Sequence, residues 1–247
     1  MGSRKTTRKP GAREWKKVNE REFHQSLIGA HAFFKDLGIA RPMVAPRSLP
    51  VNPSFNKFAL DTELPYGDVY FAGLRLGQFN FQLSDFSYFQ FSFATSDDVR
   101  YAFYPAPFGA KAQARLDLLH QLLLRGDIDE EAYHTFAEEV PLNYGRPLLR
   151  YEYNVGQYKL GLHPASHLHI GTFGDDRWAF QRQLTPRAFA LIIGKLYFRP
   201  HWEAVTVNGE DDSRENEFDR ILLEERRQCV ITPQHMFSEE EHAFFFS

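Results

Sequence analysis

The chain has 247 residues, enough for one substantial hydrophobic core and short for two, so we expect a single domain. Its formal net charge of -3 provides no general attraction to nucleic acid, so any such contact has to come from a local basic patch. The single cysteine, Cys229, excludes an internal disulfide, and the sequence shows neither a signal peptide nor an apolar run long enough to span a bilayer. We therefore expect a cytoplasmic protein with no membrane partner.

Residues 1–18 are rich in basic side chains and contain Gly and Pro, which predicts a flexible basic tail in front of a domain of residues 19–247. The basic residues are Arg4, Lys5, Arg8, Lys9, Arg13, Lys16 and Lys17. Such a tail can attract phosphate groups, with a strength that falls steeply as salt rises. The alternative is a solubilising end without a partner.

Apolar residues recur at helical spacing from Glu20 to Leu37, and Gly38 follows as a stop signal, so we expect a helix there. Residues 41–65 hold five prolines and show little periodicity. We interpret this second segment as an irregular arm that lies over the core.

Strands are predicted from about Asp68 onward, and the clearest runs are 79–83, 88–93 and 99–103, where apolar and polar residues alternate. Short turns separate these runs, which indicates consecutive antiparallel strands. One face of their sheet is predicted to be a wall of phenylalanine that needs helices against it, and the other carries Tyr, Gln, Asn and Ser that face water or line a groove. The phenylalanine stripe also has the character of a base-stacking platform, but Phe at every second position favours a buried core.

Helical periodicity returns at 110–125, where Gly126 is the expected stop. Asp129 then begins a second helix, because acidic residues suit the start of a helix. The pair is expected to form a helical hairpin that serves packing or contact with a partner.

The rest of the chain adds a strand at 177–181 and a buried helix that starts with Thr185 and Pro186 as N-cap and first turn. Residues 205–210 are expected to be a loop, and 213–227 a charged helix. Together the segments predict an α+β fold, an antiparallel sheet of about five to seven strands with helices packed on one face, in a single domain. The N-terminal helix, the helical hairpin and the helix after Thr185 are expected to cover the phenylalanine face.

The stretch 150–171 carries the candidate functional residues. Polar and apolar residues alternate at its start and again at its end, which is strand periodicity in both places. If the two strands pair as antiparallel neighbours, their polar residues share one face. Those residues are Arg150, Glu152, His167 and His169, and His163 lies just before the second strand.

A first interpretation of this cluster is a metal site, with a divalent metal as the possible cofactor. The candidate ligands are His163, His167 and His169, with a carboxylate from Glu152 or Asp175. Imidazole and carboxylate ligands suit zinc, manganese or iron. The spacing permits a metal but does not match the motifs of known zinc hydrolases.

A second interpretation is cleavage of RNA without a metal. One histidine accepts the proton of the 2'-hydroxyl as general base, and another protonates the leaving oxygen as general acid. Histidine suits both roles because its ordinary pKa lies near neutrality. Arg150 or Arg177 binds the phosphate and stabilises the charge that develops on it.

A third interpretation is structural. In this case the imidazoles form hydrogen bonds with tyrosines and backbone groups in a polar layer of the core. All three interpretations remain open from the residues alone.

A resemblance enters at the same residues. The sequence RYEY followed by HPASHLHIG, then a Thr-Pro helix start and YFRPHW, resembles an uncharacterised bacterial family of unknown function associated with mobile-element and phage-defence loci. The pattern is more loosely similar to small toxins of toxin-antitoxin pairs. These resemblances imply a bacterial defence or toxin setting, in which the target is nucleic acid and a protein partner comes from the same locus.

The leading hypothesis is therefore a nuclease-like or phosphate-handling protein of bacterial defence. Its catalytic or metal-binding residues are His163, His167, His169 and Glu152, and its phosphate-binding residues are Arg150 and Arg177. The alternative is a noncatalytic subunit of a multiprotein defence assembly, in which the same polar pocket recognises a nucleotide or a partner segment.

Overall fold

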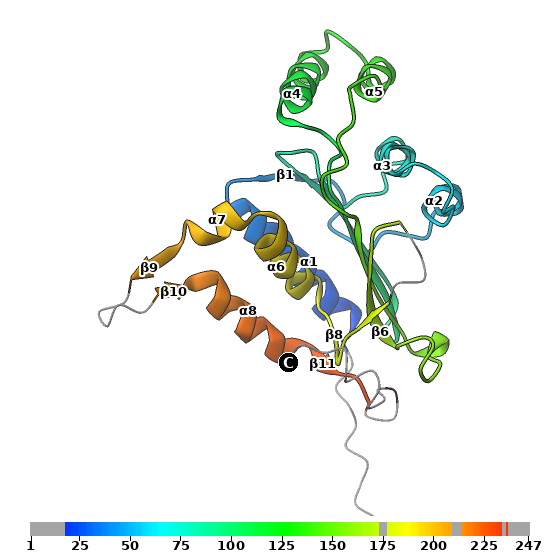
Figure 1. Cartoon of the computed structure of the whole chain (residues 1–247), viewed down its shortest axis with the longest axis vertical. Helices are drawn as coiled ribbons and strands as arrows, with labels where there is room; N and C mark the ends of the chain where they lie inside the picture. Colours follow the sequence, from blue (N-terminus) through cyan, green and yellow to red (C-terminus); the bar gives the residue numbers. More distant parts are fainter. Residues whose placement is uncertain (1–17, 173–176, 209–213, 234–235, 237–247) are drawn as a thin grey trace, which may run out of the picture.

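The structure of the chain is a computed structural model that describes residues 18–172, 177–208, 214–233 and 236 (Figure 1). Its helices are α1 (Glu20–Asp36), α2 (Pro53–Ala59), α3 (Tyr66–Arg75), α4 (Ala110–Arg125), α5 (Glu130–Glu138), α6 (Pro186–Tyr197), α7 (Arg199–Glu203) and α8 (Glu217–Gln228), with a short 3-10 helix, η1 (Val155–Gln157). Its strands are β1 (Ala40–Met43), β2 (Phe81–Leu83), β3 (Tyr88–Thr95), β4 (Asp98–Tyr104), β5 (Leu149–Asn154), β6 (Ser166–Ile170), β7 (Trp178–Ala179), β8 (Arg182–Gln183), β9 (Thr206–Asn208), β10 (Arg214–Asn216) and β11 (Val230–Ile231). Apart from Val18, the predicted basic tail lies outside the described residues. No helix in the described part of the chain has both the length and the apolar character of a membrane span.

Within the described residues, seven strands form one antiparallel sheet in the order β1-β2-β3-β4-β5-β6-β7. Each strand therefore pairs with its neighbours in the sequence, and helices α4 and α5 lie in the connection between β4 and β5. Two further pairs of short strands, β8 with β11 and β9 with β10, lie outside this sheet. The predicted α+β fold, with an antiparallel sheet in a single domain, is confirmed.

Local sequence signals set the ends of the main helices. Asn19 caps α1 by accepting a hydrogen bond from the backbone N–H of Glu22 at 3.0 Å, and the Glu22 carboxylate accepts one from the N–H of Asn19 at 3.3 Å. Thr185 caps α6 in the same way by accepting from the N–H of Ala188 at 3.0 Å. Gly126 ends α4 with a left-handed φ of 76°. These ends confirm the predicted N-terminal helix, the first helix of the hairpin and the helix after Thr185.

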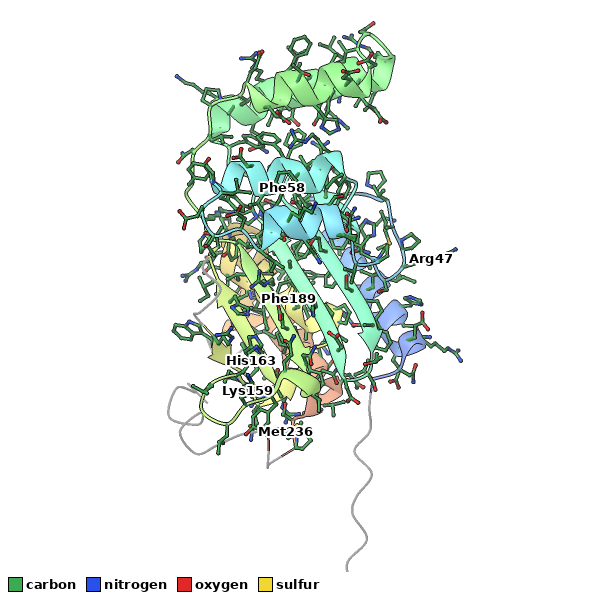
Figure 2. All side chains as sticks on the ribbon, turned by 90° about the vertical axis from the view of Figure 1, so that its right-hand side faces the viewer. Arg47, Phe58, Lys159, His163, Phe189 and Met236 are labelled. Atoms are coloured by element: carbon green, nitrogen blue, oxygen red, sulfur yellow. The ribbon has the colours of Figure 1, made fainter. Side chains whose placement is uncertain are left out.

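One face of the sheet is the predicted wall of phenylalanine. The side chains of Phe89, Phe91 and Phe103 have 0% of their surface exposed. Phe189 of α6 stands edge-on to Phe89 and Phe91, with ring centroids 6.3 and 6.2 Å away, and α1 lies beside α6 over the same face (Figures 1 and 2). Burial of each such ring stabilises the fold by about 1.5–3 kcal/mol relative to exposure. The stripe is therefore core, and the base-stacking alternative is wrong.

The opposite face is covered at one end by a second apolar cluster. Tyr88 of β3 and Tyr104 of β4 stack there with ring centroids 4.7 Å apart, and α2 and α3 pack over this end (Figure 2). Gly73 of α3 permits the close approach, because a Cβ at this position would overlap the Tyr88 hydroxyl. The other end of this face is polar, and Arg100 of β4 is exposed there, in agreement with a face that meets water.

The helical hairpin of α4 and α5 does not cover the phenylalanine face, so this part of the prediction is wrong. Leu116 and Leu119 of α4 are buried in the second apolar cluster, together with Tyr70 and Phe86. In Figure 1 the hairpin projects beyond the end of the sheet, on the side of α3. The reason lies in the topology: β4 ends at Tyr104, beneath α3, and the hairpin begins shortly afterwards.

Other boundaries also differ from the predictions. The segment 41–65 is not irregular throughout, because it contains most of β1 and all of α2. The strand expected from Asp68 is the helix α3, whose residues 69–73 are all buried; a short run of consecutive apolar residues does not distinguish a buried strand from a buried helix. Part of the loop expected at 205–210 is β9, which pairs with β10. The strand predicted at 177–181 is present as the shorter β7, and the charged helix is α8.

Candidate metal centre

Strands β5 and β6 bring the candidate residues together. Their antiparallel pairing sets Arg150 opposite His169 and Glu152 opposite His167. Residues that oppose each other in an antiparallel pair project from the same face of the sheet. The predicted common face is therefore confirmed, and it is the face opposite the phenylalanine wall.

A tight hairpin leads from η1 into β6 and places His163 beside the cluster. Lys159 and His163 form an isolated antiparallel bridge, in which the N–H of Lys159 donates to the carbonyl of His163 at 2.9 Å (Figure 2). Gly161 near the tip has a φ of 69°, a conformation that favours glycine. The ring of His163 stands edge-on to that of His167, with centroids 4.8 Å apart and an interplanar angle of 83°.

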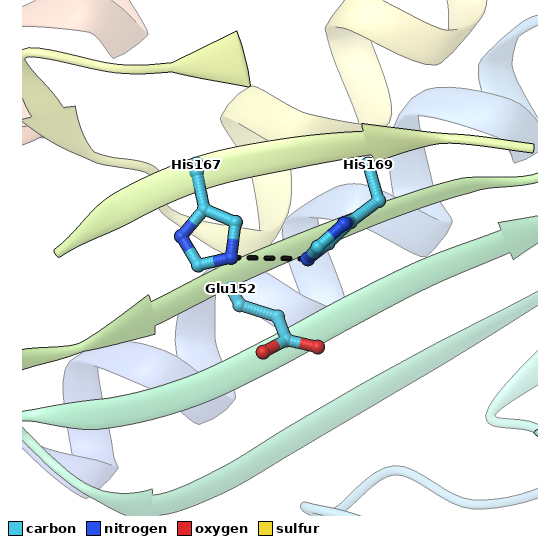
Figure 3. A group of neighbouring side chains, drawn as sticks. All are labelled: Glu152, His167 and His169. Carbon is cyan, nitrogen blue, oxygen red and sulfur yellow. Dashed lines mark hydrogen bonds between the residues drawn. The ribbon is translucent and has the colours of Figure 1, made fainter. Parts of the chain in front are cut away.

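Glu152, His167 and His169 form the centre of the site (Figure 3). The Nε2 atoms of the two histidines lie 3.0 Å apart and share a hydrogen bond, and one ligand atom from each of the three residues lies within 4.8 Å of the other two. His167 has 0% and His169 3% of its surface exposed, whereas Glu152 is half-buried. Two imidazoles and a carboxylate are a donor set found in zinc and non-haem iron sites.

A backbone carbonyl fixes the tautomer of His167. Its Nδ1 lies 2.8 Å from the carbonyl oxygen of Pro164, which can only accept a hydrogen bond, so Nδ1 carries the proton. The lone pair of neutral His167 is then on Nε2, where it accepts the hydrogen bond from Nε2–H of His169. Histidines that bind metals commonly donate their second N–H to a carbonyl in this way. The two Nε2 atoms are nearly as far apart as two ligands of a tetrahedral zinc ion, for which bonds of about 2.0–2.1 Å give a separation of about 3.3 Å.

Arg150 and Glu152 form an ion pair beside the histidines. The Nε atom of Arg150 lies 3.1 Å from Oε1 of Glu152, and the side chains are 19% and 16% exposed. The guanidinium holds the carboxylate on the histidine side of the face, and its other nitrogens provide further hydrogen-bond donors. Arg100 of β4 opposes Glu152 on the side of β5 away from His167.

The protein environment keeps two of the histidines neutral. The pKa of His167 is lowered to about 4, mainly by burial and also by the neighbouring His163 and Arg177, while the Glu152 carboxylate opposes the change. The pKa of His163 is also lowered, first by burial and then by Arg177. Both rings are therefore unprotonated at neutral pH, as a metal requires of its ligands. Acid and base chemistry without a metal needs one histidine to be protonated, which the lowered pKa values of His163 and His167 disfavour for these two rings.

The structure divides the predicted site residues into groups. Glu152, His167 and His169 form the compact set of possible ligands. His163 contacts this set through the ring of His167, and its Nδ1 is buried without a hydrogen-bond partner among the described residues. Arg177, just before β7, is near enough to lower the pKa of both His163 and His167. Asp175 lies outside the described residues.

Two contributors to the site were not predicted from the sequence. The Pro164 carbonyl sets the tautomer of His167, but a backbone acceptor has no signature in side-chain chemistry. Arg100 lies in the same row across the sheet as Glu152 and His167. The alternation of 99–103 contains this information, because it places Arg100 on the face opposite the phenylalanine wall.

Comparison with known proteins identifies the family of the chain. The model of an uncharacterised conserved protein family, DUF2290, matches residues 49–244, and the chain belongs to this family. The expected membership of a family of unknown function is confirmed. No curated protein and no solved structure matches the chain.

Proposed function

We propose that this member of the DUF2290 family is a metal-dependent, nuclease-like phosphodiesterase of bacterial defence. Glu152, His167 and His169 bind one divalent cation, for which zinc, manganese and iron are the candidates. The observation that carries the proposal is the pair of imidazoles whose Nε2 atoms lie 3.0 Å apart beside a carboxylate. The Pro164 carbonyl supports it, since it directs the lone pair of His167 into this space.

Three protein ligands are typical of a catalytic metal centre, because they leave a coordination position for water or substrate. A divalent cation held by Glu152, His167 and His169 would lower the pKa of water and offset the negative charge of a phosphate. In the proposed hydrolysis a water oxygen forms a bond to phosphorus and the bond from phosphorus to the leaving oxygen breaks. His163, which is neutral, accepts the proton of the water and returns it to the leaving oxygen. Arg150 and Arg177 bind the phosphate oxygens.

A noncatalytic subunit of a defence assembly is the second candidate, and the projecting hairpin of α4 and α5 favours it. Leu118 and Leu124 of α4 are 59% and 67% exposed, and Phe136 of α5 is 39% exposed. Apolar side chains on a projecting element are typical of a contact surface for another protein. In this case the histidine cluster serves recognition or structure, and a protein partner comes from the same locus.

Metal analysis combined with a nuclease assay tests the proposal. The full chain is purified without chelator and its zinc, manganese and iron contents are measured, together with cleavage of single-stranded DNA and RNA. We expect about one metal ion per chain. His167→Ala and His169→Ala should lose both the metal and the cleavage, whereas His134→Ala on the distant helix α5 should keep both.

The outcomes separate the candidates. Metal without cleavage of either nucleic acid would leave the metal site in place and favour the noncatalytic subunit. Unchanged cleavage in His167→Ala would contradict the catalytic role of the cluster. A protein that neither contains nor takes up these metals would contradict the metal centre itself.

A further inference from the structure

A cavity of about 410 Å³ lies away from the histidine cluster. The cavity forms where the β2–β3 hairpin, the segment before β5 and the junction of α6 with α7 meet. Its lining combines the rings of Tyr197 and Phe198 with the polar side chains of Asp85, Gln113 and Arg146. Polar and aromatic side chains that converge in one cavity can orient a ligand and hold its apolar part.

The β2–β3 hairpin holds its turn in an unusual conformation. Phe86 has a φ of 68°, in the left-handed region, and is the non-glycine residue with positive φ among the described residues. Burial and two contacts hold it there: its ring is 2% exposed, its carbonyl accepts from the hydroxyl of Tyr70 at 2.8 Å, and the guanidinium carbon of Arg41 lies 4.0 Å from its ring centroid. A bulky residue adopts this conformation only where its surroundings enforce it, and such enforced geometry is concentrated at functional sites. The enforced turn fixes the position of the neighbouring Asp85.

Asp85 presents a carboxylate to the cavity. Its Oδ1 accepts a hydrogen bond from the backbone N–H of Ser87 at 3.0 Å, and no ion pair joins it to any residue that the structure describes. Burial raises the pKa of this carboxyl, and the hydrogen bonds from Ser87 and the charge of Arg146 oppose the rise. The carboxylate is thus a hydrogen-bond acceptor with capacity left for a ligand.

Arg146 provides the opposite charge at the mouth of the cavity. Its guanidinium carbon lies 5.9 Å from the ring centroids of both Tyr197 and Phe198, and Tyr197 is anchored by its hydroxyl, which donates to the carbonyl of Pro147 at 2.7 Å. Within the described chain, Arg146 forms neither an ion pair nor a hydrogen bond. A guanidinium held near aromatic rings and without an acidic partner is well suited to bind an anion.

We propose that this cavity binds a small molecule with N–H donors at one end and an anionic group at the other. The N–H donors bind the Asp85 carboxylate, the anionic group binds Arg146, and the body of the ligand lies against Tyr197 and Phe198. A nucleoside monophosphate and a free amino acid share this chemistry. The site is separate from the histidine cluster, so the inference does not depend on the proposed nuclease function.

Calorimetric titration of the full chain tests the site with two probes, guanosine monophosphate and L-glutamine, each raised to about 10 mM. Saturable binding of either probe is expected, and the probe that binds identifies the source of the ligand. Asp85→Asn and Arg146→Gln should each weaken binding about tenfold or more, because each removes one charge from a charge-assisted hydrogen bond. Asp85→Asn keeps an oxygen that can accept from Ser87, so the turn is retained.

Matched controls keep the test decisive. Asp36→Asn and Arg21→Gln make the same chemical changes on the surface of α1 and should leave the affinity unchanged. His167→Ala should also leave the affinity unchanged. A loss of affinity in this variant would place the phosphate at the histidine cluster and overturn the assignment. Absence of saturable binding by both probes, or equal binding by wild type, Asp85→Asn and Arg146→Gln, would also overturn it.

Discussion

Two rows of residues run across the same strands on opposite faces of the sheet. One row consists of Phe91, Tyr101, Tyr151 and Leu168, and the other of Ser92, Arg100, Glu152 and His167. The rows are one residue apart in the sequence, yet the first is part of the aromatic core and the second provides Glu152 and His167, two of the three residues of the candidate metal centre. The apolar row is stabilised by contact with helices, whereas the polar row depends on specific pairs within it, so the two rows should respond differently to substitution.

The largest effect is expected on the face of the sheet that carries the apolar row, at the neighbouring residue Phe89. Phe89→Ala should lower the free energy of unfolding by about 3–5 kcal/mol, because the ring is fully buried and its removal leaves a cavity. Phe136→Ala, at a residue that is 39% exposed, should cost less than about 1 kcal/mol. Urea denaturation of both variants measures the difference. Equal losses would show that the aromatic layer is not the main source of stability.

Acid should lower the free energy of unfolding through His167 of the polar row. The pKa of His167 is about 4 in the folded chain and about 6.5 when unfolded, so the unfolded state binds more protons in this range. The neutral ring therefore contributes up to about 3 kcal/mol to the free energy of unfolding. This contribution is fully present above about pH 6.5 and is lost as the pH falls towards 4. Denaturation curves across this range should show the loss in wild type and a smaller one in His167→Gln. If the free energy of unfolding depends on pH with the same slope in both proteins, His167 is not the cause of the loss.

Loss of one ligand should affect metal affinity more than folding. His169→Ala should weaken zinc binding about 100-fold or more, equivalent to about 3 kcal/mol, while the apo protein stays folded because the phenylalanine face is intact. Competition with a chromophoric chelator measures the affinity, and circular dichroism checks the fold. If zinc binds the variant as tightly as the wild type, His169 is not a ligand.

The smallest effect is expected at the exposed end of the polar row. Arg100 pairs with Asp98 at 3.7 Å, and the two side chains are 45% and 33% exposed. Arg100→Ala should therefore change the free energy of unfolding by less than about 0.5 kcal/mol in urea denaturation. A loss of several times this size would mean that Arg100 stabilises the fold together with the other residues of the polar row.

Regular alternation of polar and apolar residues was enough to predict the centre of the sheet and the shared face of the candidate site. The runs at 88–93 and 99–103 lie in β3 and β4, and the register of β5 with β6 places Glu152 opposite His167. Alternation gives no answer in a short run of consecutive apolar residues, such as 69–73 of α3, and for this reason the sequence predicts a strand where α3 lies. It also cannot show contacts between distant segments, such as the cavity between Asp85 and Arg146 or the carbonyl that orients His167.

The connections between strands also bear on the order of folding. β5 and β6 are joined by a short segment, whereas β4 and β5 are separated by the whole region that contains α4 and α5. The entropy lost on closing a loop grows with its length, and pairings between distant segments form more slowly. We therefore expect the β5–β6 hairpin, which carries all three proposed ligands, to form before it joins β4. A metal ion bound to this hairpin would then hold β5 in register for its later pairing with β4.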